Sequence, residues 1–150
     1  MRDSYGQAQL YTMDVDGNGQ RRLTDRDGYE MSPAFSPDGV HLAFAADRDS
    51  RGLDIVLVDL NKPSDEKRLV SRHHHDTLPS LSSDGRRMAF IATSDGNPEI
   101  YLMNADGTGL FRVTHTKEEE TAPQLSSDGT HIIFSSNRAG RFAIYQIDAR

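Results

Sequence analysis

Three acidic residues recur at one place in a repeated pattern and are the first candidates for chemistry in this chain. Glu30, Asp76 and Glu120 each stand three residues before a proline. Carboxylates gathered on one surface focus a negative potential, which attracts a cation or the Lys and Arg side chains of a peptide. Alternatively, each acid caps its own turn through hydrogen bonds to the backbone. We therefore predict these acids as a binding rim, with turn capping as the competing interpretation.

Two loops rich in arginine supply the opposite charge. The segment 47–51 contains Arg48, and the segment 137–141 contains Arg138. An arginine offers a planar fork of donors that suits a carboxylate, and a sugar ligand is the other candidate. The competing interpretation is mutual ion pairing with the acids across neighbouring repeats, and such exposed pairs are worth about 0–1 kcal/mol. Arg48 and Arg138 are predicted as further rim residues.

One short segment fits the opening of a calcium loop. Asp14, Asp16 and Asn18 have the spacing of the first EF-hand ligands, and Asp25 stands in the twelfth place, where glutamate is usual. A charged residue also replaces the apolar one expected in the middle of the loop. The segment aligns with 104–109, which lies between two apolar runs. We expect a β-hairpin turn here and keep the three residues as weak metal candidates.

The only histidine cluster is His73-His74-His75, in a connection between repeats. Consecutive side chains on an extended segment point in alternating directions, so three adjacent histidines do not easily meet one metal ion. We expect an exposed loop, with His73 and His75 as weak candidates for a transition metal or a partner contact.

No spacing in the sequence indicates a catalytic centre. There is no G-x-S-x-G segment and no cysteine, and the Ser, His and Asp residues show no triad-like arrangement. We predict no cofactor and a protein that is not an enzyme. An active site can also be assembled from residues far apart in the sequence, however, so enzymatic alternatives stay open.

The composition of the chain bears on which classes of function remain. The chain has 150 residues, no cysteine and a formal net charge of −6. Disulfides and cysteine metal sites are excluded, and the basic surface that nucleic-acid binding needs is not evident. No apolar run has the length of a membrane span, and the first residues carry no apolar stretch typical of a signal peptide.

The elements that must position these residues follow from an internal repeat. Ser36-Pro37-Asp38-Gly39 returns as 82–85 and 126–129, in steps of 46 and 44 residues. Each copy predicts a short first strand (34–35, 80–81, 124–125) that starts after a proline. A second strand (40–46, 87–92, 131–136) and a third (55–58, 100–103, 144–147) are apolar on both faces, so they are buried on both sides. A short polar fourth strand is expected at 68–70 and 111–114.

Four-stranded repeats of this length, buried on both faces, are typical of the blades of a β-propeller. We predict an all-β, partial propeller in one domain, with a half-blade (5–26), two blades (30–71 and 76–115) and an incomplete blade (120–150). In a propeller the acids and the two arginine loops share one face. Such an arc does not close alone, so we expect either a fragment of a longer propeller or part of a homo-oligomeric ring.

The repeat resembles the TolB-like, WD-related propeller family. The resemblance rests on Pro-x-x-Ser-Pro/Ser-Asp-Gly, on the Leu-Thr step and above all on 94–107, which reads SDGNPEIYLMNADG. It implies a non-enzymatic module that binds a protein or peptide partner through its loop face or channel, in the periplasm or secreted. Two alternatives are the substrate-gating propeller of a prolyl-oligopeptidase-type peptidase and a carbohydrate-active propeller enzyme.

Overall fold

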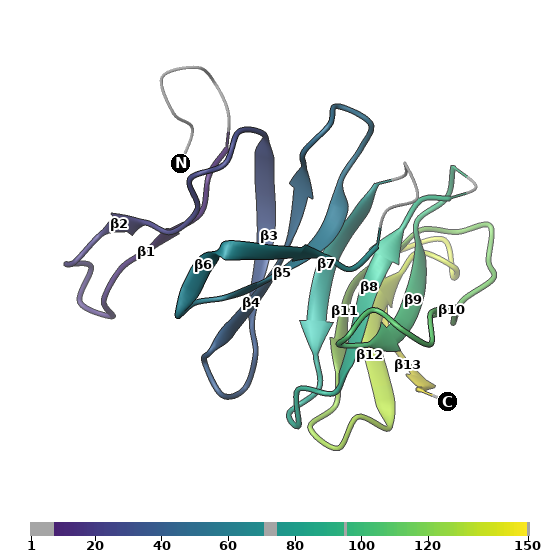
Figure 1. The fold of residues 1–150 in the computed structure, drawn as a ribbon. Helices are drawn as coiled ribbons and strands as arrows, with labels where there is room; N and C mark the ends of the chain where they lie inside the picture. Colours follow the sequence, from purple (N-terminus) through teal and green to yellow (C-terminus); the bar gives the residue numbers. More distant parts are fainter. Residues whose placement is uncertain (1–7, 71–74, 95, 150) are drawn as a thin grey trace.

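The computed structural model describes residues 8–70, 75–94 and 96–149, and all regular structure in these ranges is β-strand. The strands run antiparallel and are drawn in Figure 1. Their bounds are β1 (Tyr11–Thr12), β2 (Arg21–Arg22), β3 (Tyr29–Phe35), β4 (His41–Asp47), β5 (Asp54–Asp59), β6 (Lys62–Arg68), β7 (Asp76–Leu81), β8 (Arg87–Ala92), β9 (Glu99–Asn104), β10 (Phe111–Arg112), β11 (Glu120–Leu125), β12 (His131–Ser136) and β13 (Ala143–Asp148).

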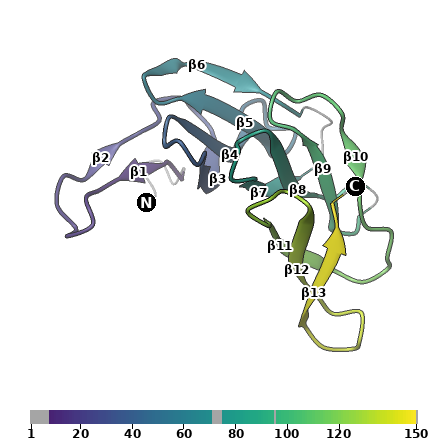
Figure 2. The same ribbon diagram turned by 90° about the horizontal axis from the view of Figure 1, so that it is seen from below.

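The strands form four sheets in chain order. The N-terminal hairpin is β1-β2, blade 1 is β3-β4-β5-β6, blade 2 is β7-β8-β9-β10, and blade 3 is β11-β12-β13. Each strand pairs with the next along the chain, as in propeller blades. Figure 2 shows the sheets following one another along an arc, with the hairpin at one end and blade 3 at the other. The prediction of an all-β partial propeller is confirmed.

Side chains from consecutive sheets make up the core. Phe44, Phe90 and Phe134 occupy the same place in β4, β8 and β12 and are fully buried. The hairpin packs on blade 1, blade 1 on blade 2, and blade 2 on blade 3, in three apolar clusters. This stacking explains why the second and third strands are apolar on both faces.

The first strand of each blade is longer than the sequence predicts. Instead of starting after the proline, β3, β7 and β11 begin several residues earlier and carry the proline inside the strand. The register shifts at the preceding residues, Ser32, Leu78 and Ala122, whose φ angles are 54°, 53° and 51°. A proline has no N–H for the ladder, so a β-bulge there lets pairing continue on both sides.

These three bulges face a common space. The strands β3 and β7 lie side by side, as do β7 and β11. Ser32, Leu78 and Ala122, each with the proline that follows it, line one cavity of about 320 Å³. The first strands therefore form the inner wall of the arc.

The fourth strand of blade 1 also differs from its prediction. It lies at Lys62–Arg68 rather than at 68–70, because the connection from β5 is a tight turn in which Asp59 pairs directly with Lys62. In blade 2 a longer turn intervenes, and β10 is reduced to two residues. The second and third strands lie where the sequence places them, within one or two residues.

The recurring Ser-x-Asp-Gly turn closes each first hairpin. In blade 1 the Gly39 N–H donates to the Ser36 carbonyl at 2.9 Å, and Gly39 has a φ of 67°, which suits glycine. The Asp side chain accepts hydrogen bonds from the Ser hydroxyl and from a backbone N–H, which together hold its pKa below the usual value. In blade 3 the same arrangement, led by Ser126, lowers the pKa of Asp128 to about 2.

Candidate binding site on the loop face

The predicted acid of blade 1 is buried in an ion-pair network. Glu30 is the second residue of β3, and its Oε1 lies 2.5 Å from Nη2 of Arg48. The Nε of Arg48 lies 2.8 Å from Glu66 Oε1, and Arg26 reaches the other oxygen of Glu66 at 3.3 Å. Burial disfavours the charge of Arg48, but the hydrogen bonds to Glu66 and Glu30 outweigh it and raise the pKa of the guanidinium.

Glu30 also fastens the N-terminal hairpin to blade 1. Its Oε2 accepts hydrogen bonds from the backbone N–H of Leu10, at 3.2 Å, and from the hydroxyl of Thr24. Glu30 thus connects an arginine in a loop of its own blade with the preceding sheet. It therefore does more than cap its own turn.

Blade 3 repeats the pair in a more exposed setting. Glu120 begins β11, and its Oε1 accepts hydrogen bonds from Arg138 and Thr116, both at 2.8 Å, and from Ser136 at 3.2 Å. The Arg138 guanidinium lies 5.1 Å from the ring centroid of Phe134, within the range of a cation–π contact. Oε2 of Glu120 is buried and has no hydrogen-bond partner among the described residues.

Blade 2 departs from this pattern. Asp76 begins β7 and is fully buried like the two glutamates. Where blades 1 and 3 have an arginine, blade 2 has Ser94, whose hydroxyl lies 2.8 Å from the hydroxyl of Tyr101. The structure therefore joins Glu30 with Arg48 and Glu120 with Arg138, each within one blade. The interpretation of ion pairs across neighbouring repeats is wrong for these two pairs.

A second recurring pair of polar side chains was not predicted from the sequence. In the hairpin and in blades 1 and 2, a residue before or at the start of one strand binds an arginine of the next strand. Its signal is the 45-residue spacing of Gln9, Asp54 and Glu99. The pairs are Gln9–Arg22 (2.6 Å), Asp54–Arg68 (3.2 Å) and Glu99–Arg112 (2.7 Å).

The calcium-loop segment is a hairpin turn. The Asp14 N–H donates to the Asn18 carbonyl at 2.8 Å, and Asn104 and Thr108 repeat that bond at 2.8 Å in blade 2. The Asp16 side chain accepts hydrogen bonds from Asn18, which lower the pKa of Asp16. In the described ranges no three His, Cys, Asp or Glu side chains are grouped so that they could hold a metal ion. His73 lies outside these ranges.

A cleft opens between blades 2 and 3 at the loop face, the side of the arc that carries Arg48 and Arg138. It has a volume of about 380 Å³. Glu119, Glu120 and His75 line one part of this loop-face cleft. Its apolar lining comes from Leu78, Ile91, Pro98 and Phe142, and Phe142 is 55% exposed.

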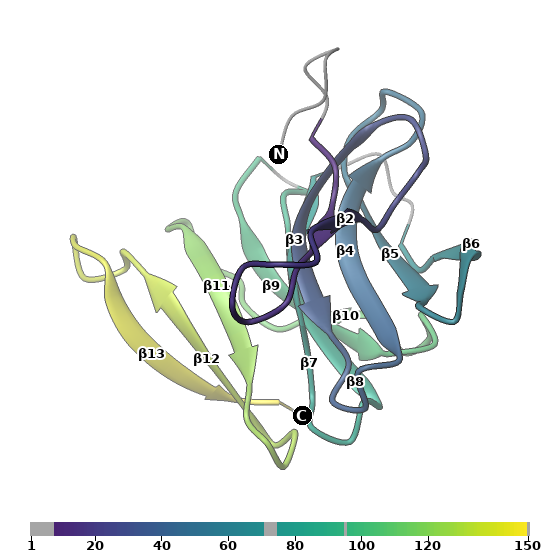
Figure 3. The same cartoon turned by 90° about the vertical axis from the view of Figure 1, so that its left-hand side faces the viewer.

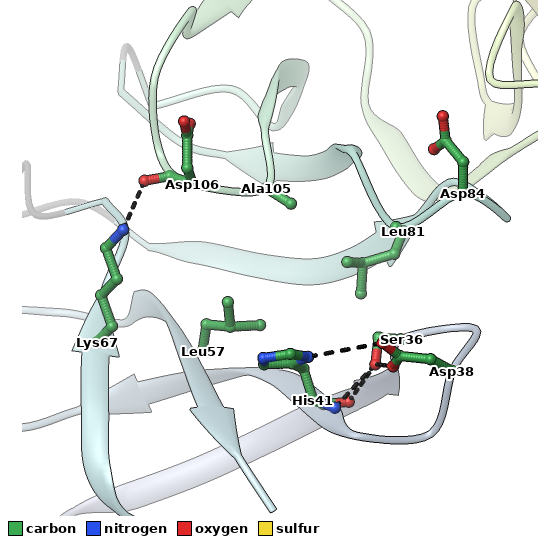
Figure 4. Close-up of a pocket in the computed structure, with 10 residues that line it drawn as sticks. Ser36, Asp38, His41, Leu57, Lys67, Leu81, Asp84, Ala105 and Asp106 are labelled. Carbon is green, nitrogen blue, oxygen red and sulfur yellow. Dashed lines mark hydrogen bonds and ion pairs between the residues drawn. The ribbon is translucent and has the colours of Figure 1, made fainter.

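The opposite face holds a second hollow, between the turns of blades 1 and 2. Figure 4 shows Leu57 and Leu81 beside it, with charged side chains around them. Lys67 donates to the backbone carbonyl of Asp106 at 2.8 Å, which joins the two blades. Asp84 belongs to a Ser-x-Asp-Gly turn, and its carboxylate accepts a hydrogen bond from Ser82. These polar groups stabilise the turns and the junction between the blades.

Four-stranded antiparallel blades, joined in chain order along an arc, define the chain as part of a β-propeller. The family model described as the TolB beta propeller domain matches residues 3–150. The chain belongs to this family. Within the described part of the chain, no helix is long and apolar enough to cross a membrane.

Individual relatives agree with this family. The chain is 44% identical over 43 residues to a protein TolB homolog of Chlorobium chlorochromatii (strain CaD3), covering 29% of this chain and 10% of the relative. The structure of TolB from Acinetobacter baumannii has a TM-score of 0.82 and 29% identity, over 99% of this chain and 37% of that one. The structure of a putative TolB from Agrobacterium tumefaciens has a TM-score of 0.83 and 24% identity, over 98% of this chain and 55% of that one. The chain thus spans about half, or less, of these relatives.

Proposed function

We propose that the chain is a non-enzymatic binding module that holds a protein or peptide segment in the loop-face cleft. The observation that carries the proposal is the lining of this cleft, which contains both an exposed phenylalanine, Phe142, and an exposed acid, Glu119. An aromatic anchor beside an acid suits a segment with an apolar side chain next to a Lys or Arg. The net charge of −6 favours the approach of basic segments.

The buried pairs support a structural role for the recurring acids. Glu30 and Glu120 hold Arg48 and Arg138 of their own blades, and both carboxylates are shielded from solvent. A carboxylate bound in this way fixes the shape of the loop face and is poorly placed to exchange protons with a substrate. The pair of blade 3, Glu120 with Arg138, therefore supports the cleft, while Glu119 and Phe142 offer the contacts. Membership of the TolB family makes the periplasm the proposed compartment and further blades of a longer propeller the proposed context.

The experiment is a selection of peptides from a random displayed library on the immobilised chain. Enriched peptides should pair an apolar residue with a basic one, and fluorescence anisotropy of a synthetic copy should give their affinity. Phe142→Ala should weaken binding about tenfold or more, because it removes the aromatic anchor. Glu119→Gln should weaken it less and abolish part of its salt dependence.

The matched control is Phe111→Ala, which removes a partly exposed phenylalanine from β10, away from the cleft. It should leave the affinity unchanged. Peptides that bind Phe142→Ala and Glu119→Gln as tightly as the parent chain would contradict the proposal, and so would a selection without enrichment.

A further inference from the structure

An arginine joins blades 2 and 3 on the face opposite the loop-face cleft. Figure 3 shows the turns that follow β3, β7 and β11 at the same edge of the arc. The guanidinium of Arg87, the first residue of β8, donates to the carbonyl of Gly129 at 2.9 Å and to that of Ala149 at 2.7 Å. Gly129 lies in the turn after β11 and Ala149 follows β13, so this side chain spans the junction between the two blades.

The junction between blades 1 and 2 has no such arginine. In the repeat, His41 stands where blade 2 has Arg87, and its imidazole lies 4.0 Å from a carboxylate of its own turn. The carbonyls that correspond to the two acceptors of Arg87 are those of Gly85 and Ala105. Among the described residues no donor binds either carbonyl. The acceptors of the junction are thus repeated in blade 2, whereas their donor is not repeated in blade 1.

The hollow between the turns of blades 1 and 2, here called the turn-face hollow, lies at these acceptors. It has a volume of about 380 Å³, and His41, Gly85 and Ala105 are part of its lining. Leu57 and Leu81 supply apolar lining, as Figure 4 shows. Ligand pockets measure roughly 300–1,000 Å³, so the turn-face hollow has room for a side chain from outside the chain.

Three carboxylates give the turn-face hollow a negative potential. Asp38, Asp84 and Asp106 line it, and all three residues are exposed. In each of them Oδ1 accepts a backbone N–H of its own turn, so the charge of the group is held at the edge of the hollow. Lys67 also lines the hollow, and its ammonium is bound to the carbonyl of Asp106 at 2.8 Å. The lining therefore favours a cationic ligand.

We propose that the turn-face hollow binds the arginine side chain of a partner protein. The guanidinium donates to the carbonyls of Gly85 and Ala105, as Arg87 does one blade further on, and the aliphatic stem packs on Leu57 and Leu81. A planar guanidinium has donors for both carbonyls and for a carboxylate of the edge, which a lysine ammonium cannot present in one plane. An arginine inside a polypeptide suits the hollow better than the free amino acid, whose own carboxylate would face the acids.

The experiment is a titration of the isotope-labelled chain with N-acetyl-arginine N-methylamide, followed by NMR. The amide signals of Gly85 and Ala105 should shift, and the lysine counterpart should bind about tenfold more weakly. His41→Arg should abolish the shifts, because the chain's own arginine would then reach the two carbonyls, as Arg87 does at the next junction. His131→Arg is the matched control, since it makes the same change at the corresponding place in blade 3 and should leave binding unchanged.

A second pair of variants tests the charge at the edge of the hollow. Asp84→Asn keeps the oxygen that accepts from Ser82 and from the Arg86 N–H, so the turn should persist while binding weakens about two- to fivefold. Asp128→Asn changes the corresponding turn of blade 3, outside the hollow, and should not alter the affinity. Thermal melts check that each variant folds.

Three results would overturn the proposal. The first is a parent chain whose spectrum does not change with the arginine amide. The second is equal binding of the amide by the parent and by His41→Arg. The third is binding of the lysine counterpart, or of free arginine, as tight as that of the arginine amide, which would remove the preference for a guanidinium carried on a polypeptide.

Discussion

Arg48 is the side chain on which the charge network of blade 1 depends. It binds both Glu30 and Glu66, and only 11% of its side chain is exposed. Arg48→Met should destabilise the chain by about 3–5 kcal/mol, because it leaves the buried carboxylate of Glu30 without its cation and Glu66 with Arg26 alone. Arg138→Met should cost less, because 31% of the Arg138 side chain is exposed and water can solvate part of the site.

Urea unfolding at neutral pH, followed by circular dichroism, measures both losses. Arg51→Met is the matched control, since Arg51 is an exposed arginine in the same loop. Equal destabilisation by Arg48→Met and Arg51→Met would show that general loop charge, and not the buried pair, is responsible.

The backbone strain of the bulge in each first strand can be tested directly by a substitution. Ala122 is exposed and has a φ of 51°, a conformation that costs an L-residue about 1–2 kcal/mol and glycine little. Ala122→Gly should therefore be neutral or slightly stabilising, since relief of strain offsets the added flexibility of the unfolded chain. Ala143→Gly, at the exposed start of β13, should destabilise by about 0.5–1 kcal/mol. The midpoints of thermal melts compare the two, and equal losses would mean that the bulge is unstrained.

The sequence predicts some elements better than others, for physical reasons. The second and third strands follow from alternation and from the buried phenylalanines, which are local signals. The start of β11 does not, because Glu120 and Thr121 have the composition of a loop and become strand only through pairing with Ser136 and Ser135. The partner of Glu30 lies 18 residues away, so its burial depends on contacts that no local pattern contains. Recurrence at the repeat spacing would have found Glu99 and Arg112.

At the scale of the whole molecule, each sheet packs only on its neighbours along the arc, so the loss of one core should stay local. Phe134 is buried between blades 2 and 3, and Phe134→Ala removes about 3–5 kcal/mol of packing there. Hydrogen exchange should show faster opening in β11–β13 and the facing residues of blade 2, with the amides of blade 1 unchanged. Phe90→Ala acts in the core between blades 1 and 2, so it should also weaken protection in β4 and β5. If both variants lowered protection uniformly in every sheet, the arc would unfold as one cooperative unit instead of as a row of coupled blades.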